Sequence, residues 1–184
     1  MSRKRHAQVD FNYESFLKTH RKKPIFDPDA LPVQLTAEKR GIEKIIPHRD
    51  PLLFIDSLTG IDVENGKIAG RRTIPFSDPV FNGHFPEYPV YPGTFAVEML
   101  GQISLCLFYF VTNNSEKIEE DAEPASVRAT RILGSYFLQP IRPGDSLTLL
   151  AMQTEYDEFM ARAVGQALVG GTVSCITAGE VYLL

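Results

Sequence analysis

The feature that most constrains the fold is an apolar run of helical length. Residues 94–111, TFAVEMLGQISLCLFYFV, carry a single charge, Glu98, and follow the segment NGHFPEYPVYPG at 82–93. The run falls short of the roughly 20 apolar residues that cross a bilayer, and a charge at the bilayer centre is costly. A helix that is apolar nearly all round lies in the centre of a soluble domain. We therefore expect a buried helix from Pro92 to about 113–114, and no membrane span.

Strand-like segments flank this run on both sides. Residues 52–61 and 67–74 read as strands, and Asn65-Gly66 between them is a strong hairpin signal. After an acidic, polar loop at 114–125, four more strands are expected. Their approximate ranges are 126–139, 146–156, 159–169 and 172–183, with turns at Pro143-Gly144-Asp145 and Gly170-Gly171. The predicted fold class is α+β, a curved antiparallel sheet wrapped around one long central helix.

Length and charge restrict the classes of protein further. A chain of 184 residues fits one domain with an extension. We assign 1–40, with its two basic clusters and three prolines, to an extension that wraps the domain or stays mobile, and 41–184 to the domain itself. A formal net charge of -4 argues against nucleic acid as the main partner.

Localisation follows from the N-terminal residues and the cysteines. The N-terminus is basic but lacks the apolar core of a signal peptide. Cys106 and Cys175 lie among apolar residues, as free buried thiols do, and show no disulfide or metal spacing. We expect a cytoplasmic protein without a metal or organic cofactor.

The candidate chemistry centres on His84 and Glu98. A lone loop histidine is more often structural than catalytic, whereas a carboxylate in an apolar helix needs a partner. Gln102 lies one helical turn from Glu98, on the same face. The glycines and prolines at 82–93 would hold His84 in one shape, and Gly93 would offer a free N–H at the helix start. A base, an acid and an oxyanion donor suit proton removal beside a carbonyl followed by loss of a leaving group.

Four motifs in this order resemble those of the 3-hydroxyacyl-acyl-carrier-protein dehydratases of the hot-dog fold. They are PHRDPLLFID at 47–56, GHFP at 83–86, Pro92-Gly93 followed by Glu98 and Gln102, and FLQPIRPGD at 137–145. The resemblance covers about 41–184.

The resemblance implies a site in which a loop histidine and a helix carboxylate meet across a dimer interface. Carried over, His84 takes the α-proton of a (3R)-3-hydroxyacyl thioester, and Glu98 hydrogen-bonds or protonates the departing hydroxyl. Gly93 N–H binds the thioester oxygen, and Gln102 orients Glu98. With glutamate instead of aspartate at this position, the chain resembles the branch of the family that only dehydrates, and less the branch that also isomerises the double bond. The partner implied is an acyl carrier protein, and the assembly a homodimer, a higher oligomer or a heterodimer with a paralogue.

Several further expectations accompany this site. Phe85, Tyr91 and Phe95 are expected to line the acyl tunnel, with Tyr91 departing from the methionine common in the family. The apolar neighbours of Glu98 should raise its pKa through desolvation. His48 is expected to be structural, bonding backbone carbonyls. Scattered arginines, among them Arg142, are mostly ordinary surface residues, and a few near the tunnel could contact the acidic carrier.

Two other functions stay open on the residues alone. In a thioesterase of the same fold Glu98 would activate water, although the GHFP segment argues against this. A catalytically silent acyl-binding subunit is the alternative outside the enzymes, and the intact set of His84, Gly93, Glu98 and Gln102 argues against it.

Overall fold

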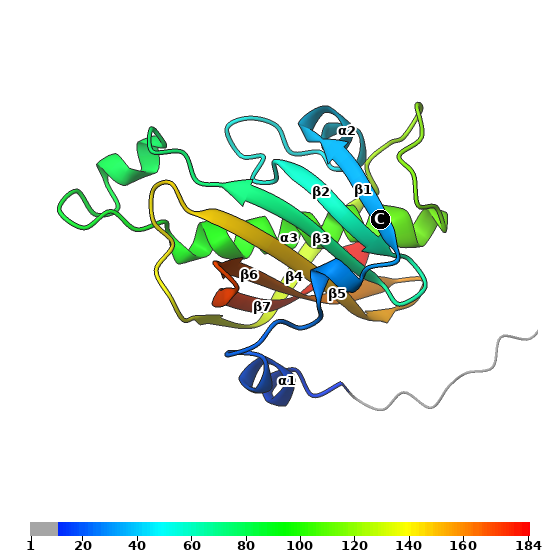
Figure 1. The fold of residues 1–184 in the computed structure, drawn as a ribbon. Coiled ribbons are helices and arrows are strands. Elements are labelled where there is room, and N and C mark those ends of the chain that lie inside the picture. The colour runs from blue at the N-terminus through cyan, green and yellow to red at the C-terminus, as the bar shows by residue number, and fades with distance from the viewer. Residues whose placement is uncertain (1–10) are drawn as a thin grey trace, which may run out of the picture.

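A seven-stranded antiparallel sheet curves around one long helix in the computed structural model, which describes residues 11–184 (Figure 1). The sheet has the strand order β1-β2-β3-β5-β6-β7-β4, so β1 and β4 form its edges. The strands are β1 (Val33–Glu38), β2 (Ser57–Asp62), β3 (Lys67–Thr73), β4 (Val127–Phe137), β5 (Ser146–Tyr156), β6 (Met160–Val169) and β7 (Thr172–Leu183). The helices are α1 (Tyr13–Thr19), α2 (Lys39–Ile45) and α3 (Gly93–Asn113), with short 3-10 helices at Pro28–Ala30 and Pro79–Asn82.

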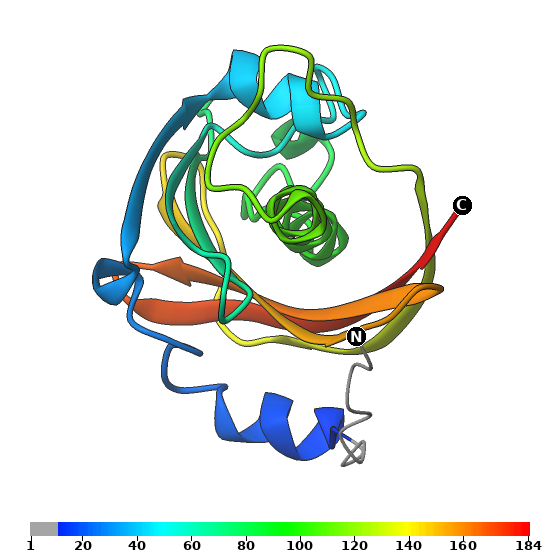
Figure 2. The same ribbon diagram turned by 90° about the vertical axis from the view of Figure 1, so that its right-hand side faces the viewer.

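Helix α3 lies in the hollow of the sheet, as the view along its axis shows (Figure 2). Ile103, Cys106 and Phe110 on this helix are fully buried, and Ile42 and Ile45 of α2 belong to the same core. By length and composition α3 could cross a membrane, but most of its apolar surface is packed against the sheet and α2. The predicted α+β fold with a central helix is therefore confirmed.

The turns follow the glycine and asparagine signals in the sequence. Gly66 ends the β2–β3 turn with a φ of 59°, and Gly170 and Gly171 join β6 to β7 with φ values of 55° and 79°. Such left-handed backbone favours glycine, and at Gly170-Gly171 it matches the twist of a two-residue hairpin. Asn114, with a φ of 46°, ends α3 in the same way.

The sheet begins earlier than the sequence predicted. Strand β1 pairs with β2 through Val33 opposite Ile61 and Glu38 opposite Ser57, and α2 follows directly. The boundary expected between residues 40 and 41 thus falls inside the fold. In VQLTAE apolar and polar residues alternate, and every second side chain points inward, as in a strand with one buried face. The prolines just before this segment suggested a loop instead.

Residues 11–32, which we call the strap, cover the outer face of the sheet (Figure 2). Leu17 and Leu31 are buried there. They pack over an apolar surface that the sheet turns away from α3, formed by Ala69, Leu150, Val164, Leu168, Val173, Ile176 and Ala178. An extension that wraps the domain was one of the two alternatives, and the described part of the segment takes it. The first basic cluster, at 3–6, lies outside the described residues.

Polar contacts from β6 hold the strap in place. The carboxamide of Gln166, fully buried, accepts from Ile25 N (2.9 Å) and donates to the carbonyls of His20 (2.7 Å) and Lys23 (3.0 Å). Three strap backbone groups are satisfied by one side chain, so the path of residues 20–25 is fixed by β6.

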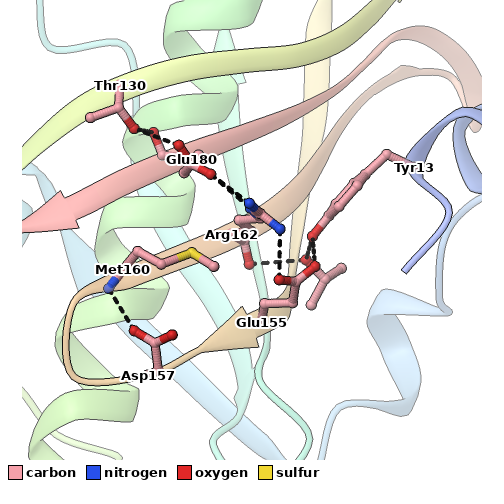
Figure 3. Close-up of polar contacts among 8 residues, drawn as sticks. Tyr13, Thr130, Glu155, Asp157, Met160, Arg162 and Glu180 are labelled. Carbon is pink, nitrogen blue, oxygen red and sulfur yellow. Dashed lines mark hydrogen bonds and ion pairs between the residues drawn. The ribbon is translucent and has the colours of Figure 1, made fainter. Parts of the chain in front are cut away.

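A second attachment is an ionic network under α1 (Figure 3). The Arg162 guanidinium donates to Glu155 (2.7 Å) and Glu180 (2.8 Å), and the Tyr13 hydroxyl donates to Glu155 (2.7 Å). Thr130 of the edge strand donates to Glu180 (3.0 Å). The network therefore links β4, β5, β6 and β7 to the first helix of the strap.

Candidate active site

The segment 82–93, which we call the bracket, is folded back on itself around His84. The His84 N–H donates to Val80 O (2.9 Å), and Val90 N–H donates to His84 O (3.3 Å). Farther along, Tyr91 N–H donates to Ile141 O (2.7 Å), which ties the bracket to the strand-end segment 137–145. Backbone hydrogen bonds, together with the prolines and glycines of the bracket, thus fix the position of this histidine.

The contact of the His84 ring defines its protonation pattern. Its Nδ1 lies 2.9 Å from the Val90 carbonyl oxygen, which can only accept. Nδ1 therefore carries the hydrogen, and in the neutral ring Nε2 is left as a lone-pair acceptor. The arrangement leaves Nε2 of the neutral His84 ring able to accept a proton.

A pocket of about 620 Å³ opens beside His84 at the start of α3. Gly93, the first residue of that helix, also borders it. A Cβ at position 93 would lie 2.7 Å from the Phe137 ring, so glycine allows that ring to rest on the helix start. The Gly93 N–H belongs to the first helical turn, whose N–H groups have no intrahelical acceptor. It can therefore serve a negatively charged oxygen in the pocket.

The motif at 137–145 forms another wall of this pocket. Asp145 accepts from Arg142 N–H through its side chain (2.7 Å), and its own N–H donates to Arg142 O (3.1 Å). Across the same turn Gly144 N–H donates to Ile74 O (2.8 Å), and Ile74 N–H donates to Asp145 O (2.9 Å). The motif thus has a structural reason: it holds residues 137–141 against the bracket.

Glu98 is anchored by a side chain on its own helix and by a loop. Gln102 donates through Nε2 to Glu98 Oε1 (2.8 Å), which is the contact expected from their spacing. The same carboxamide donates to Leu52 O and accepts from Phe54 N, both at 2.8 Å. Gln102 is 1% exposed, so its orientation is fixed by these bonds. Glu98 is accordingly held relative to the 46–56 loop.

His48 has a different role from the one expected. Its Nε2 lies 3.2 Å from Glu98 Oε1, and its Nδ1 is buried with no hydrogen-bond partner in the described part of the chain. Among residues 11–184 neither ring nitrogen bonds a backbone carbonyl, contrary to the expectation. The sequence signal for this contact was the position of His48 in the motif 47–56. Leu52 and Phe54 of the same motif bond the Gln102 side chain, which in turn bonds Glu98.

The pKa of Glu98 shifts in the direction opposite to our expectation. Hydrogen bonding from His48 lowers it, desolvation raises it less, and the Gln102 bond lowers it further. The net result is a pKa below the ordinary glutamate value. Desolvation was overestimated because the side chain is about half exposed in the protomer and has two N–H donors.

A second cavity, a slot of about 200 Å³, lies farther along α3, between the helix and strands β4, β6 and β7. Glu98 lies at the end of the slot nearest the helix start, and Phe108 lies near its far end. The sheet side is made largely of small inward residues, including Ala129, Ala161, Ala163, Gly165 and Gly179. His84 does not line this slot, and Glu98 does not line the pocket. One protomer therefore presents the two groups to separate spaces.

The three expected tunnel residues lie in different surroundings. Tyr91 borders the pocket and is buried, with its ring near those of Phe54, Phe81 and Phe95. Phe85 is 54% exposed and stacks on the His84 ring with centroids 4.1 Å apart. Phe85 and Phe95 line neither the pocket nor the slot of the protomer. Within residues 11–184, no cluster of three His, Cys, Asp or Glu side chains could hold a metal ion.

Comparison with known proteins places the chain in a family. Residues 46–177 match the FabA-like domain. The 3-hydroxyacyl-[acyl-carrier-protein] dehydratase FabZ of Clostridioides difficile is 37% identical over 135 residues, which cover 73% of this chain and 88% of that protein. The enzyme of the same name from Campylobacter jejuni is 36% identical over 134 residues, covering 72% and 87%.

Solved structures agree at the level of the fold. The dehydratase heterocomplex ApeI:P from Xenorhabdus doucetiae superposes with a TM-score of 0.55 at 19% identity, covering 78% of this chain and 90% of that one. The HP0420 homologue from Helicobacter felis gives a TM-score of 0.55 at 12% identity, covering 79% and 88%. With the sequence matches, they show that the chain belongs to the FabA-like family of hot-dog-fold 3-hydroxyacyl-[acyl-carrier-protein] dehydratases.

Proposed function

We propose that this protein is a hydro-lyase that dehydrates (3R)-3-hydroxyacyl thioesters of an acyl carrier protein to trans-2-enoyl thioesters in fatty-acid or related biosynthesis. The observation that carries the proposal is the bond from His84 Nδ1 to Val90 O, which leaves Nε2 as a base beside the Gly93 N–H. Family membership and the FabZ relatives support the same reaction.

The reaction balances with these residues and a proton from solvent. His84 Nε2 takes the proton from the α-carbon, and the electron pair of that C–H bond forms the new double bond. The bond from C3 to its oxygen breaks, and the hydroxyl, which hydrogen-bonds to Glu98, leaves as water with a proton that passes from solvent through the Glu98 carboxyl group. Negative charge on the thioester oxygen is stabilised by Gly93 N–H, and one such donor accounts for about 3–4 kcal/mol in other enzymes. Proton exchange with solvent then resets His84 and Glu98.

The active site is proposed to form between two subunits. His84 and Gly93 of one protomer border the pocket, whereas Glu98 borders the separate slot farther along α3. A second copy that brings its slot to the pocket would place its Glu98 near His84. We propose a homodimer as the minimal active unit, with a heterodimer or a higher oligomer as the alternatives.

The slot is proposed to hold the acyl chain. Its small inward side chains leave an apolar channel that begins at Glu98 and runs toward Phe108. A chain seated there would have its C3 near the carboxyl and its tail along α3. Acyl length would then be limited near the Phe108 ring, which packs against Tyr156 with centroids 5.7 Å apart.

The carrier protein is proposed to approach at the mouth of the pocket. Arg142 donates to the Tyr88 hydroxyl (2.6 Å), and its guanidinium lies 4.7 Å from the centre of that ring. Both side chains are exposed, and Tyr88 borders the pocket. A cation at this point suits an acidic carrier, and the contact should weaken as salt rises.

Other parts of the proposal concern the setting of the reaction. The glutamate at position 98 supports dehydration without isomerisation, and the chemistry above needs no metal or organic cofactor. A cytoplasmic location is proposed because Cys106 and Cys175 are buried free thiols, as in proteins of reducing compartments.

The test is to incubate the protein with a 3-hydroxyacyl carrier protein and follow the intact mass of the carrier. Loss of one water, absent in His84→Ala and strongly reduced in Glu98→Gln, is the expected result. Release of free acid would instead indicate a thioesterase, and an unchanged acyl carrier would indicate a silent acyl-binding subunit. Either outcome overturns the proposal.

A further inference from the structure

The loop after α2 brings His48 against the carboxyl group of Glu98. The Nε2–Oε1 distance is 3.2 Å, and the His48 side chain is 24% exposed while that of Glu98 is 48% exposed. The contact is made between side chains of a loop and of α3, so it depends on how the loop packs on the helix.

Both N–H donors that reach Glu98 meet the same oxygen. Gln102 Nε2 lies 2.8 Å from Oε1, the atom that His48 also contacts. Oε2 has no hydrogen-bond partner among residues 11–184. The two carboxyl oxygens are therefore unequal: one is fixed by protein donors, and the other is free to meet a substrate. A carboxyl proton would sit on Oε2, because Oε1 already accepts two hydrogen bonds.

We propose that His48 is a positioning residue, which together with Gln102 fixes Oε1 of Glu98 so that Oε2 exchanges the proton with the departing 3-hydroxyl group. The proposal rests on the proposed dehydratase function for the identity of that hydroxyl. The geometry itself, two donors on one oxygen, is independent of the reaction.

Among the charged groups around Glu98, loss of His48 should change the pKa of Glu98 most. Arg131 of β4, Arg162 of β6 and Glu180 of β7 also line the slot. Arg162 and Glu180 are paired with each other, and their bonds lie with Tyr13 under the strap. In the described part of the chain, His48 is the only titratable group whose side chain bonds to the Glu98 carboxyl. Removing this donor should raise the pKa of Glu98, since the bond favours the ionised form.

The shape of the His48 contact supplies a matched pair of variants. Glutamine can place an N–H close to where the imidazole Nε2 lies, whereas the shorter asparagine reaches only the region of Nδ1, which has no partner. His48→Gln should therefore keep the bond to Oε1, and His48→Asn should lose it. His20→Asn is the control histidine, because the His20 ring bonds the Phe16 carbonyl in the strap, away from Glu98.

The first experiment follows the Glu98 carboxyl carbon by ¹³C NMR across pH in the intact dimer, with its signal assigned through Glu98→Gln. We expect a higher pKa in His48→Asn than in the wild type, and wild-type values in His48→Gln and His20→Asn. An unchanged pKa in His48→Asn overturns the proposal. This readout needs no activity, so it separates failure of His48 positioning from failure of the dehydratase function.

The second experiment measures dehydration kinetics of the same variants. Loss of a hydrogen bond to a charged group should lower kcat about tenfold or more in His48→Asn, with KM little changed and kcat restored in His48→Gln. Equal losses in both variants would overturn the proposal in favour of a packing role. If His48→Asn does not fold, ¹⁵N NMR of the wild-type histidines decides instead. The His48 Nε2 signal must shift in Glu98→Gln, and no shift overturns the proposal.

Discussion

His84 and Glu98 border two separate cavities along α3, His84 the pocket at the helix start and Glu98 the end of the slot. Each side chain has its own support, from Val90 O and from Gln102 and His48 respectively. Each protomer thus presents the two groups to separate spaces. This separation supports the proposal of a site completed by a second copy.

Gly93→Ala should lower activity and stability together. The added Cβ would lie 2.7 Å from the Phe137 ring, so either the ring or the helix start must move. Overpacking of this kind costs about 1–3 kcal/mol of unfolding free energy. We expect a lower Tm and a kcat reduced at least tenfold. Gly41→Ala in α2 is the control, because its Cβ would make ordinary contacts at 3.4 Å or more. Equal kcat for both variants would contradict a role for the Gly93 position.

Gly101→Leu should shorten the range of acyl chains that the enzyme accepts. Gly101 lines the slot, and no atom lies within 4 Å of the position its Cβ would take. A leucine there would fill the channel beyond Glu98. Competition between short and long 3-hydroxyacyl carriers should shift toward the short one. An unchanged preference, with the variant folded, would show that the acyl chain takes another path.

Gln166→Leu should loosen the strap while leaving the sheet folded. The substitution removes three bonds to strap backbone groups and leaves those groups without partners. The expected cost is about 3 kcal/mol or more of unfolding free energy, since three groups lose a partner and each unsatisfied buried group costs about 1–3 kcal/mol. Hydrogen exchange should increase in residues 20–25 more than in β5 or β6. Uniform acceleration across the sheet would contradict the view of a separate strap.

Acid should weaken the network beneath α1. Burial acts to raise the pKa of Glu180, but its bonds to Arg162 and Thr130 outweigh burial and lower the pKa below the ordinary value. A carboxyl with a lowered pKa in the folded state stabilises the protein above its unfolded pKa, and this contribution is lost as pH falls through the folded pKa. Stability measured by urea unfolding should therefore fall below about pH 4.5.

Arg162→Gln is the variant that isolates this effect. It leaves Glu180, 4% exposed, without its cation and should destabilise the protein by about 3–5 kcal/mol at neutral pH. The acid-dependent part of the stability should shrink, because the pKa of Glu180 would rise. An unchanged pH dependence of stability in Arg162→Gln would assign the acid effect to other groups.

The fold was predictable from the sequence because its strongest signals are local. An apolar run with one carboxylate indicated the central helix, and Asn65-Gly66 and Gly170-Gly171 indicated hairpins that the structure contains. The edge strand β1 was missed because it is only six residues long and follows a proline-containing segment. Its place is decided by pairing with β2, a contact with residues far along the chain.

The sequence predicted which residues lie in the candidate site better than it predicted the pKa of Glu98. Spacing alone placed Gln102 beside Glu98, and the bracket around His84 has the rigid form its prolines suggested. The bond from His48 to Glu98 was not foreseen, because it joins a loop to a helix through the tertiary fold. The sign of the Glu98 pKa shift followed from that bond, so it was missed with it.

The most direct test of the shared active site is to mix two inactive variants. His84→Ala and Glu98→Ala are purified, unfolded together, refolded as a mixture and assayed for dehydration of a 3-hydroxyacyl carrier protein. In a mixed dimer one of the two sites then has both wild-type residues, so an equal mixture should recover about one quarter of wild-type activity. Refolding each variant alone gives the background. Recovery near one quarter is the predicted result, and a mixture no more active than its components would contradict a site built from two subunits.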